Sequence, residues 1–325
     1  MDTILVTGGA GYIGSHVVRE LARSGYHPVI LDHLGEGHRE AAGAGDFVLG
    51  NLSDESVLNS LFSQQAIDGV MHFSSRCYVG ESVENPQLYY EENVLGALTL
   101  FRVMRRHGVR RFIFSSSCAV YGNPQYTPID EGHPWNPINP YGETKYFVER
   151  ILREYDRAYD FPFVAFRYFN AAGASLDGKI GESHDPESHL IPLILRVAKG
   201  EAAEITVFGD DYPTRDGTCV RDFVHVLDLA AAHIAAYEWL KQGKGSDSFN
   251  LGTGSGYTVR EVVSAAERVT GRRVASRVAG RRSGDPPELV ADSSKASSLL
   301  GWTPRYSELE TIVETAWSWE QKRTY

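Results

Sequence analysis

The chain has 325 residues, 42% of them hydrophobic and 23% charged, which suffices for two globular domains around a sizeable core. Its formal net charge of −10 argues against nucleic acid or an anionic membrane surface as the main partner. Three cysteines without metal-ligand spacing, no apolar run of membrane-spanning length and a strand that starts almost at once predict a cytoplasmic chain with reduced thiols, no bound metal and no signal peptide.

The first predicted element is a buried strand at residues 2–7, and an amphipathic helix is predicted at residues 12–24. Glycines fill the turn between them and fit both Gly-x-Gly-x-x-Gly and Gly-x-x-Gly-x-x-Gly: Gly8, Gly9, Gly11 and Gly14. Small residues in such a turn let the backbone approach a pyrophosphate at the N-terminus of the helix. The pattern predicts a dinucleotide site, and an ordinary glycine-rich turn is the alternative.

A second predicted strand, residues 28–31, is followed directly by Asp32. A carboxylate at this distance from the glycines accepts hydrogen bonds from the ribose hydroxyls of an adenosine and repels a 2′-phosphate. Asp32 therefore favours NAD over NADP as the cofactor. Arg39 and nearby histidines leave the preference open.

Further strand-like runs follow at residues 46–49, 70–73, 112–114 and 163–166, with helical stretches between them. This alternation predicts an α/β fold with a Rossmann-type, doubly wound parallel sheet. The longest predicted helices cover residues 81–107 and 141–159. After residue 169 the rhythm breaks. We therefore predict an NAD-binding domain at residues 1–169, with segments returning from the second half, and a smaller α/β substrate domain at residues 170–325.

A candidate catalytic pair lies at the start of the helix at residues 141–159. Tyr141 and Lys145 are one helical turn apart, so they share a face and the ammonium is expected beside the phenol. A tyrosine has a pKa near ~10, and a neighbouring cation lowers it, so the pair suits proton transfer from a sugar hydroxyl. Alone, a Tyr-x-x-x-Lys match is weak evidence, because solvated helix faces also produce it.

Together these residues resemble the extended short-chain dehydrogenase/reductases, and within them most closely the family of UDP-glucose 4-epimerases. Motifs in the same order in both halves of the chain carry the resemblance: Gly8 to Gly14, His72-Phe73, Val79-Gly80-Glu81-Ser82, Ser115-Ser116-Ser117, Val120-Tyr121-Gly122, Asn139-Pro140-Tyr141, Lys145, Arg167-Tyr168-Phe169-Asn170, Asp211-Tyr212-Pro213-Thr214, Asp216-Gly217-Thr218 and Val220-Arg221-Asp222. Each motif is moderately specific, but collinear matches over nearly the whole chain are hard to obtain by chance.

The resemblance implies an isomerase that uses NAD to invert carbon 4 of a UDP-hexose through a transient 4-keto sugar. It implies that Tyr141 takes the proton of the 4-hydroxyl, that Lys145 holds the nicotinamide ribose and lowers the pKa of Tyr141, and that Ser117 hydrogen-bonds the reacting oxygen. The cofactor-binding residues that it implies are Gly8, Gly11, Tyr12, Ile13, Gly14, Asp32, Asn51, Leu52, Phe73, Ser74, Ser75, Asn93, Ser115, Tyr141, Lys145 and Tyr168.

On the substrate side, the resemblance places Arg221 and Arg282 at the diphosphate and Asp285 at the uridine ribose, with solvated surface arginines as the alternative. Leu289 would border the sugar pocket, where a tyrosine would exclude a 2-acetamido group and a leucine leaves more room. UDP-glucose and UDP-galactose are then the main pair, with the N-acetylhexosamine pair also accepted. The remaining implied substrate-binding residues are Ser117, Tyr141, Phe169, Asn170, His189, Leu190 and Phe208.

Two departures from the commonest family pattern concern the cofactor. Cys77 stands where some members have a lysine, and Asn51 replaces an acid near the adenine. These replacements put the tightness of NAD binding in doubt but leave the catalytic pair untouched. Apolar stripes on the helices at residues 81–107 and 141–159 predict, with the resemblance, a four-helix contact in a homodimer.

Other activities use the same scaffold. A 4,6-dehydratase needs an Asp-Glu pair where this chain has Cys118 and Ala119, and a UDP-glucuronate epimerase would want a cation for the sugar carboxylate. A non-catalytic NAD sensor has no need for the catalytic residues. A UDP-pentose 4-epimerase stays open, because a pentose lacks only carbon 6.

Overall fold

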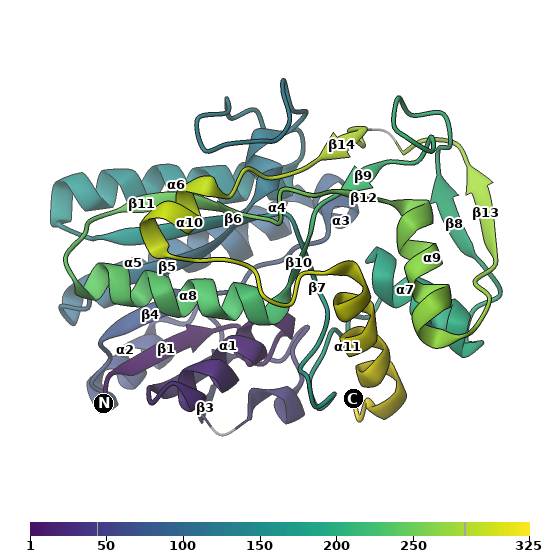
Figure 1. Ribbon diagram of the computed structural model, residues 1–325. Coiled ribbons are helices and arrows are strands. Elements are labelled where there is room, and N and C mark those ends of the chain that lie inside the picture. Colours follow the sequence, from purple (N-terminus) through teal and green to yellow (C-terminus); the bar gives the residue numbers. More distant parts are fainter. Residues whose placement is uncertain (44, 283) are drawn as a thin grey trace.

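The computed structural model describes residues 1–43, 45–282 and 284–325. Within them, seven parallel strands form one sheet in the order β11-β6-β5-β4-β1-β2-β3, which confirms the Rossmann-type fold (Figure 1). Its strands are β1 (Thr3–Thr7), β2 (His27–Asp32), β3 (Asp46–Leu49), β4 (Gly69–His72), β5 (Arg111–Ser117), β6 (Phe163–Tyr168) and β11 (Asp247–Leu251). The strand order reverses between β1 and β4, and the carboxyl ends of strands at such a switch point are where doubly wound sheets bind ligands.

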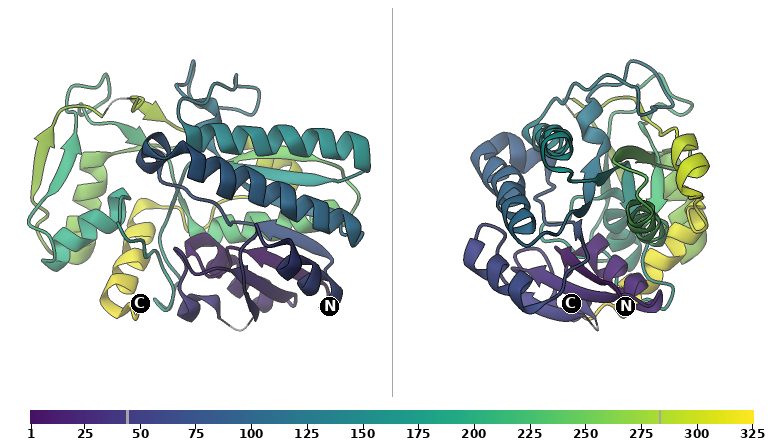
Figure 2. Two further views of the ribbon diagram at one scale, coloured as in Figure 1. Left: turned by 180° about the vertical axis from the view of Figure 1, so that it is seen from behind. Right: turned by 90° about the vertical axis from the view of Figure 1, so that its left-hand side faces the viewer.

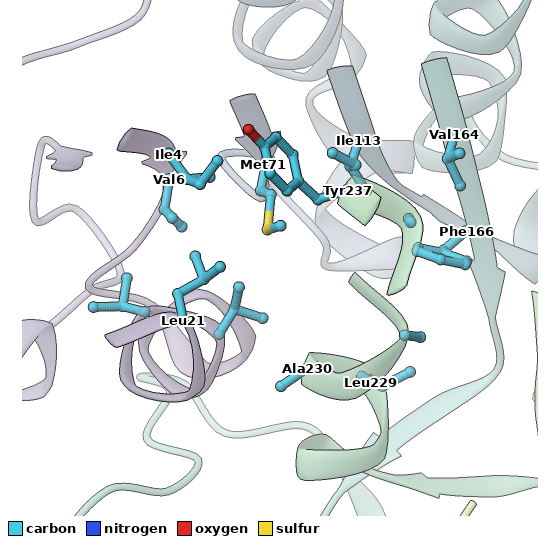
Figure 3. Close-up of a cluster of buried hydrophobic side chains, with 14 of the residues drawn as sticks. Ile4, Val6, Leu21, Met71, Ile113, Val164, Phe166, Leu229, Ala230 and Tyr237 are labelled. Carbon is cyan, nitrogen blue, oxygen red and sulfur yellow. The ribbon is translucent and has the colours of Figure 1, made fainter. Parts of the chain in front are cut away.

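Helices cover both faces of the sheet (Figure 2). One face carries α1 (Tyr12–Arg23) and α8 (Val226–Lys241), and the other carries α2 (Glu55–Gln64), α5 (Gly96–Arg106) and α6 (Pro140–Tyr159). Because the strands are buried on both faces, they read as continuous apolar runs rather than alternating ones. Figure 3 shows one of the two resulting cores, where Ile4 and Val6 of β1 face Leu21 of α1 while Leu229 belongs to α8.

The second half of the chain supplies both a sheet edge and a separate layer. Strand β11 completes the nucleotide-binding sheet, and helices α8 and α10 (Ser294–Leu300) pack beside it. The other elements build a separate layer with its own apolar core at the right of Figure 1. These elements are β7 (Asn170–Ala172), α7 (Leu190–Lys199), β8 (Ile205–Phe208), β9 (Val220–Arg221), β10 (Phe223–His225), β12 (Tyr257–Thr258), α9 (Val259–Thr270), β13 (Ser276–Ala279), β14 (Glu288–Leu289) and α11 (Leu309–Lys322). The domain boundary after residue 169 stays a prediction.

The long helix predicted at residues 81–107 is interrupted. The segment contains α3 (Val79–Glu84), α4 (Pro86–Tyr89), the π-helical turn η2 (Tyr90–Leu95) and α5. Asn85 leaves the helical conformation, with φ −134° and ψ 68°, because the ring of the following proline disfavours helical backbone at the residue before it. Short 3₁₀ segments, η1 (Arg39–Ala42) and η3 (Cys118–Tyr121), complete the described elements.

Helix α6 begins where the sequence predicts it and holds the candidate catalytic pair in its first turns. The side chain of Asn139 accepts a hydrogen bond from the Gly142 N–H, and Pro140 occupies the first helical turn, where its missing N–H costs nothing. The helix ends at Asp160 in the left-handed conformation, φ 49°. No helix among the described residues is long and apolar enough to cross a membrane.

Candidate active site

The glycine turn after β1 has no room for side chains. A Cβ on Gly14 would lie 2.1 Å from the Gly8 carbonyl oxygen, and a Cβ on Gly8 would lie 2.6 Å from the Ser74 nitrogen. Gly8 also has φ +71°, which favours glycine. Helix α1 then starts at Tyr12 without a side chain capping its N-terminus. A bare helix start approached by glycine backbone fits a pyrophosphate, so the residues present fit a dinucleotide.

Asp32, at the end of β2, is buried and fixed in position. Its Oδ2 accepts a hydrogen bond from the Ala10 N–H at 2.9 Å, and its Oδ1 accepts one from the Leu34 N–H at 2.8 Å. Each carboxylate oxygen keeps a second lone pair for another donor. The carboxylate is therefore held beside the glycine turn, as a contact with ribose hydroxyls requires.

The candidate catalytic residues come together at the carboxyl end of β5. Lys145 donates a hydrogen bond from Nζ to the Ser115 carbonyl oxygen at 2.8 Å, and its Nζ lies 5.7 Å from the Tyr141 ring centre. The Ser117 hydroxyl contacts the Tyr141 phenol and also accepts a hydrogen bond from the Ala119 N–H at 3.2 Å. A phenol, an ammonium and a hydroxyl thus meet at one edge of the sheet.

Burial controls the charge states of this group. Burial lowers the pKa of Lys145 to about 8. Burial also raises the pKa of Tyr141 well above its usual range, while the Ser117 contact acts the other way. The prediction that Lys145 depresses the pKa of Tyr141 is therefore wrong for the protein alone, because desolvation outweighs an ammonium that is directed at a carbonyl. Without ligands Tyr141 is therefore a phenol, and it can take a proton only where its surroundings favour the phenolate.

Two polar contacts support the pair. The Tyr168 hydroxyl is hydrogen-bonded to the Ser115 hydroxyl, so the ends of β6 and β5 are tied together. Asn93 is almost fully buried and donates a hydrogen bond to the Thr144 hydroxyl at 3.0 Å, immediately before Lys145. Asn93 thereby fixes α6 to η2. Both residues were predicted as cofactor contacts, and in this structure they are also internal supports.

The other predicted cofactor residues line the neighbouring strand ends. Asn51 accepts hydrogen bonds from the Ser53 backbone and hydroxyl, and the Ser75 hydroxyl donates to the Arg76 carbonyl. Leu52 packs in one sheet core and Phe73 against the other. The side chains of these two residues are occupied by packing, so their backbone is the part that a cofactor could contact.

The predicted diphosphate and uridine residues form two pairs. Arg221 places Nη2 3.3 Å from Asp285 Oδ1 and donates from Nη1 to the Pro286 carbonyl. The Arg282 guanidinium carbon lies 4.1 Å from the centre of the Phe208 ring. Arg221 and Asp285 are therefore fixed relative to one another, whereas Arg282 is exposed and held by an aromatic face.

Among the remaining predicted substrate residues, one makes a polar contact and three pack in apolar clusters. Asn170 donates from Nδ2 to the Asp222 carbonyl at 2.9 Å. Phe169 and Leu289 belong to one apolar cluster that also contains Cys118. Leu190 begins α7 and packs on the second-half core. Leu289 thus packs against an apolar cluster that includes residues directly after β5 and β6.

A partly buried cluster of two carboxylates and two imidazoles was not recognised from the sequence as a unit. His189 Nδ1 lies 2.9 Å from Glu182 and 2.8 Å from Glu187, and His184 Nδ1 lies 3.4 Å and 3.6 Å from the same carboxylates. Burial opposes the charge on both imidazoles, but the carboxylates outweigh it and raise the pKa of His184 to about 9 and that of His189 to about 11.

This donor set could hold a metal ion, since one ligand atom from each residue lies within 4.8 Å of the others. At neutral pH, however, a metal would have to displace two imidazole protons. The signal available in the sequence was the His-x-x-x-x-His spacing of His184 and His189, with Glu182 just before it and Glu187 within it. Within the structure, the four side chains form ion pairs beside Tyr12, whose ring centre is 6.4 Å from that of His184.

The model of the NAD-dependent epimerase/dehydratase family matches residues 4–252. The chain belongs to this family. Among its members, the UDP-glucose 4-epimerase of Halalkalibacterium halodurans is 48% identical over 322 residues, which cover 99% of this chain and 96% of that one. The UDP-glucose 4-epimerase of Rhizobium leguminosarum is 48% identical over 321 residues, covering 99% and 98%.

Solved structures of this epimerase/dehydratase family superpose over the whole chain. The UDP-glucose 4-epimerase of Brucella ovis, in complex with NAD, is 49% identical with a TM-score of 0.96 and covers 98% of both chains. The UDP-Glc/GlcNAc 4-epimerase of Campylobacter jejuni is 40% identical with a TM-score of 0.87 and covers 99% of both.

Proposed function

We infer that this chain is an isomerase that interconverts UDP-glucose and UDP-galactose by NAD-dependent epimerisation at carbon 4. The observation that carries this conclusion is the meeting of Tyr141, Ser117 and Lys145 at the end of β5, in a chain whose glycine turn and Asp32 fit a dinucleotide. Relatives named UDP-glucose 4-epimerase match it over nearly the full length. The alternative activities are not favoured by these matches.

NAD, when bound, accepts a hydride from carbon 4 of the sugar and returns it to the same carbon, so no net oxidation occurs. On the chain's side, the glycine turn and the free start of α1 would hold the pyrophosphate, and Asp32 would accept hydrogen bonds from the adenosine ribose. Lys145 and Tyr168 would face the nicotinamide side.

The proton is handled by Tyr141. When the 4-hydroxyl loses hydride from its carbon it must also lose its proton, and Tyr141 is the group placed to take it and return it. A phenol with a raised pKa keeps its own proton, so Tyr141 can take the proton of the sugar only if neighbouring positive charge favours its phenolate during turnover. Lys145 supplies one such charge, and Ser117 supplies a hydrogen bond that stabilises the reacting oxygen.

On the substrate side, Arg221 and Asp285 form the anchor that we assign to the UDP part. Their contact at 3.3 Å orients the guanidinium for a diphosphate and the carboxylate for ribose hydroxyls. Asn170, Phe208 and Arg282 would complete the UDP contacts, with His189 and Leu190 on the uridine side. The exposed position of Arg282 allows it to move onto the diphosphate.

We also propose that N-acetylhexosamines are accepted. The Campylobacter jejuni relative is a UDP-Glc/GlcNAc 4-epimerase. In this chain, Leu289 lies in the cluster with Phe169 and Cys118, beside the catalytic strand ends, and it lacks the ring and hydroxyl with which a tyrosine would fill that space. Leu289 is therefore the residue that we assign to the 2-acetamido side of the sugar.

We propose a homodimer formed through the helices α3 to α6. Large apolar side chains on these helices are exposed to solvent, which is unusual for a surface that stays uncovered. They are Val79, Val83, Tyr90, Leu95 and Phe147. Figure 2 shows that α5 and α6 lie side by side on one face, where a second copy would complete a four-helix contact. Light scattering at micromolar concentration should give twice the mass of the chain, and a monomer would contradict the proposal.

We also propose that residues 1–169 form the NAD domain and residues 170–325 the UDP-sugar domain. A cytoplasmic location is proposed from the three free cysteines.

The activity itself is tested by incubating the purified protein with a panel of UDP-hexoses, UDP-N-acetylhexosamines and UDP-pentoses and analysing the sugars released by hydrolysis. UDP-galactose should yield glucose fastest. A protein that converted only pentoses, or nothing, would refute the proposed function.

A further inference from the structure

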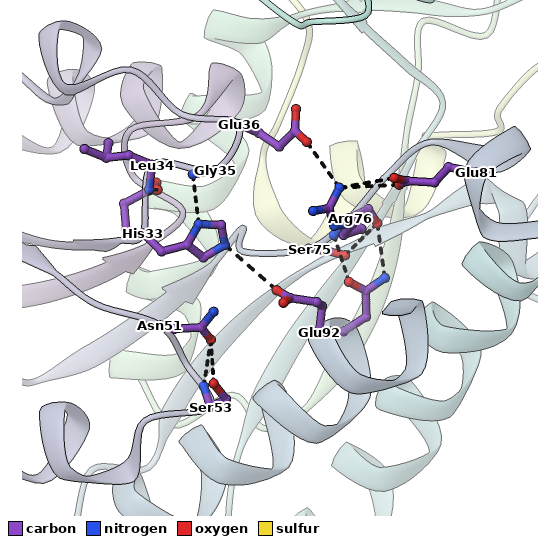
Figure 4. Close-up of polar contacts among 12 residues, drawn as sticks. His33, Leu34, Gly35, Glu36, Asn51, Ser53, Ser75, Arg76, Glu81 and Glu92 are labelled. Atoms are coloured by element: carbon purple, nitrogen blue, oxygen red, sulfur yellow. Dashed lines mark hydrogen bonds and ion pairs between the residues drawn. The ribbon is translucent and has the colours of Figure 1, made fainter. Parts of the chain in front are cut away.

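The loop after β2 is joined to the loop after β4 by one carboxylate. Glu36 Oε1 lies 3.3 Å from Arg76 Nη1 (Figure 4). Glu36 Oε2 accepts a hydrogen bond from the Tyr78 hydroxyl at 3.0 Å. We call Glu36 with these two partners the Glu36 link. These three residues belong to none of the sequence motifs named above, and no catalytic or binding role has been assigned to them.

The sheet order shows what the Glu36 link crosses. Strand β1 lies between β4 and β2, and its carboxyl end is the glycine turn. A contact between the β2 and β4 loops must therefore span the carboxyl end of β1. On the β2 side the loop rests on the glycine turn itself, because the His38 N–H donates to the Ala10 carbonyl at 2.9 Å and a Cβ on Gly37 would lie 2.9 Å from the Ala10 carbonyl carbon.

On the β4 side the link is anchored to the catalytic helix. The Arg76 N–H donates to Asn93 Oδ1 at 2.8 Å, and Asn93 Nδ2 donates back to the Arg76 carbonyl and on to Thr144 of α6. The Arg76 guanidinium also lies 3.3 Å from Glu81 of α3. Arg76 thus has a fixed backbone and a side chain shared between two carboxylates.

Charge gives a reason for this arrangement. A pyrophosphate at the glycine turn is anionic, and the carboxylate of Glu36, next to Gly37, would repel it if it stood alone. Arg76 neutralises that carboxylate and brings a guanidinium, the group best suited to phosphate, to the same edge.

We propose that the Glu36 link retains NAD in this enzyme by closing across the carboxyl end of β1, so that the link must open before the cofactor can leave. The proposal rests on the use of NAD in the proposed function. Glu36, Arg76 and Tyr78 are positioning residues, because they act on the cofactor's escape and not on the reacting atoms.

The test is the dissociation rate of NAD from the holoenzyme, measured by a chase of bound radiolabelled NAD with unlabelled NAD and rapid filtration. Glu36→Gln should release NAD roughly threefold to tenfold faster than the native protein, because the ion pair is partly exposed and such pairs are worth little individually. Tyr78→Phe should have a smaller effect in the same direction. Added salt should speed release from the native protein and have less effect on Glu36→Gln.

A matched control distinguishes loss of the Glu36 link from the mere loss of one negative charge. Glu40 lies four residues further along the chain and is exposed, and its side chain makes no hydrogen bond or ion pair with any described residue, so Glu40→Gln removes the same charge without removing a side-chain contact. A double-mutant cycle adds a second check. Because Glu36 and Arg76 act as a pair, the double variant Glu36→Gln/Arg76→Gln should release NAD no faster than the faster single variant.

The proposal is overturned if Glu36→Gln releases NAD within twofold of the native rate, if Glu40→Gln accelerates release equally, or if the two single effects multiply in the double variant. In each case epimerisation by the native holoenzyme would leave the proposed function intact. A native protein that bound no NAD would overturn both.

Discussion

Removing the carboxylate of Glu149 should destabilise the protein strongly, although Glu149 touches neither of the proposed ligands. Glu149 on α6 is 0% exposed and Arg167 on β6 is 1% exposed. The Arg167 guanidinium donates three hydrogen bonds to this carboxylate, at 2.7, 2.9 and 3.2 Å, and Ser116 donates a further one at 2.6 Å. Without Glu149 a guanidinium charge is left buried with only the Tyr121 hydroxyl as acceptor.

Breaking a buried pair from one side costs about 3–5 kcal/mol, so Glu149→Leu should lower the free energy of unfolding by that amount. The double variant Glu149→Leu/Arg167→Met removes the unpaired charge. It leaves Ser116, Tyr121 and Ser248 short of one partner each, at about 1 kcal/mol per hydrogen bond and less for the longer Ser248 contact of 3.4 Å. The double variant should therefore lose only about 2–3 kcal/mol and be more stable than the single variant.

The measurement is urea unfolding followed by tryptophan fluorescence at a fixed, saturating NAD concentration, because bound cofactor adds to the apparent stability. Glu154→Gln on the same helix is the control. Its partner Arg157 and Glu154 itself are mostly exposed, so the loss should be below about 0.5 kcal/mol. A double variant as unstable as Glu149→Leu would refute the reasoning, since the buried charge would then not be the cause.

Four further outcomes are expected. Tyr141→Phe should keep the fold and bound NAD but lose at least ~100-fold in turnover, measured by steady-state kinetics. Lys145→Ala should also slow turnover. In the native enzyme turnover should decline above about pH 8, where Lys145 loses its positive charge, and this decline should be absent from the variant, so that its pH optimum moves upward. Leu289→Tyr should lose kcat/KM for UDP-N-acetylglucosamine by at least ~10-fold while keeping that for UDP-galactose, and equal losses on both would reject gating. Unfolding stability should fall as the pH drops from 6.5 towards 4, because buried imidazoles stay neutral in the fold and gain protons on unfolding; a flat profile in urea titrations would contradict this. Burial lowers the pKa of these groups to about 4 for His16 and His233 and to about 3 for His72 and His225.

The nucleotide-binding half could be predicted from the sequence because its signals are local. Strand β3 was predicted at its observed bounds, since apolar runs between turn residues define such strands. Tyr141 and Lys145 share a helical face by spacing alone, so their proximity was also predictable. The interruption at Asn85 could have been predicted as well, because Pro86 was visible and restricts the residue before it.

The features that were not predicted correctly from the sequence depend on burial and on contacts made only in the fold. The pKa of Tyr141 was predicted to fall because only the sequence neighbour Lys145 was visible, whereas desolvation comes from the surrounding fold. The Glu36 link joins residues 40 positions apart and carries no motif. The cluster of Glu182 and His189 is local in sequence, but its ion pairs form only where the loop packs beside Tyr12.

The central claim is that one carbon loses and regains the same hydride while Tyr141 exchanges its proton. The most direct measurement is to incubate the purified protein with UDP-galactose deuterated at carbon 4 and to follow the product by NMR. The account predicts UDP-glucose that keeps the deuterium at carbon 4, with none gained from deuterated water when unlabelled substrate is used. Loss of the label to solvent, or no UDP-glucose at all, would contradict it.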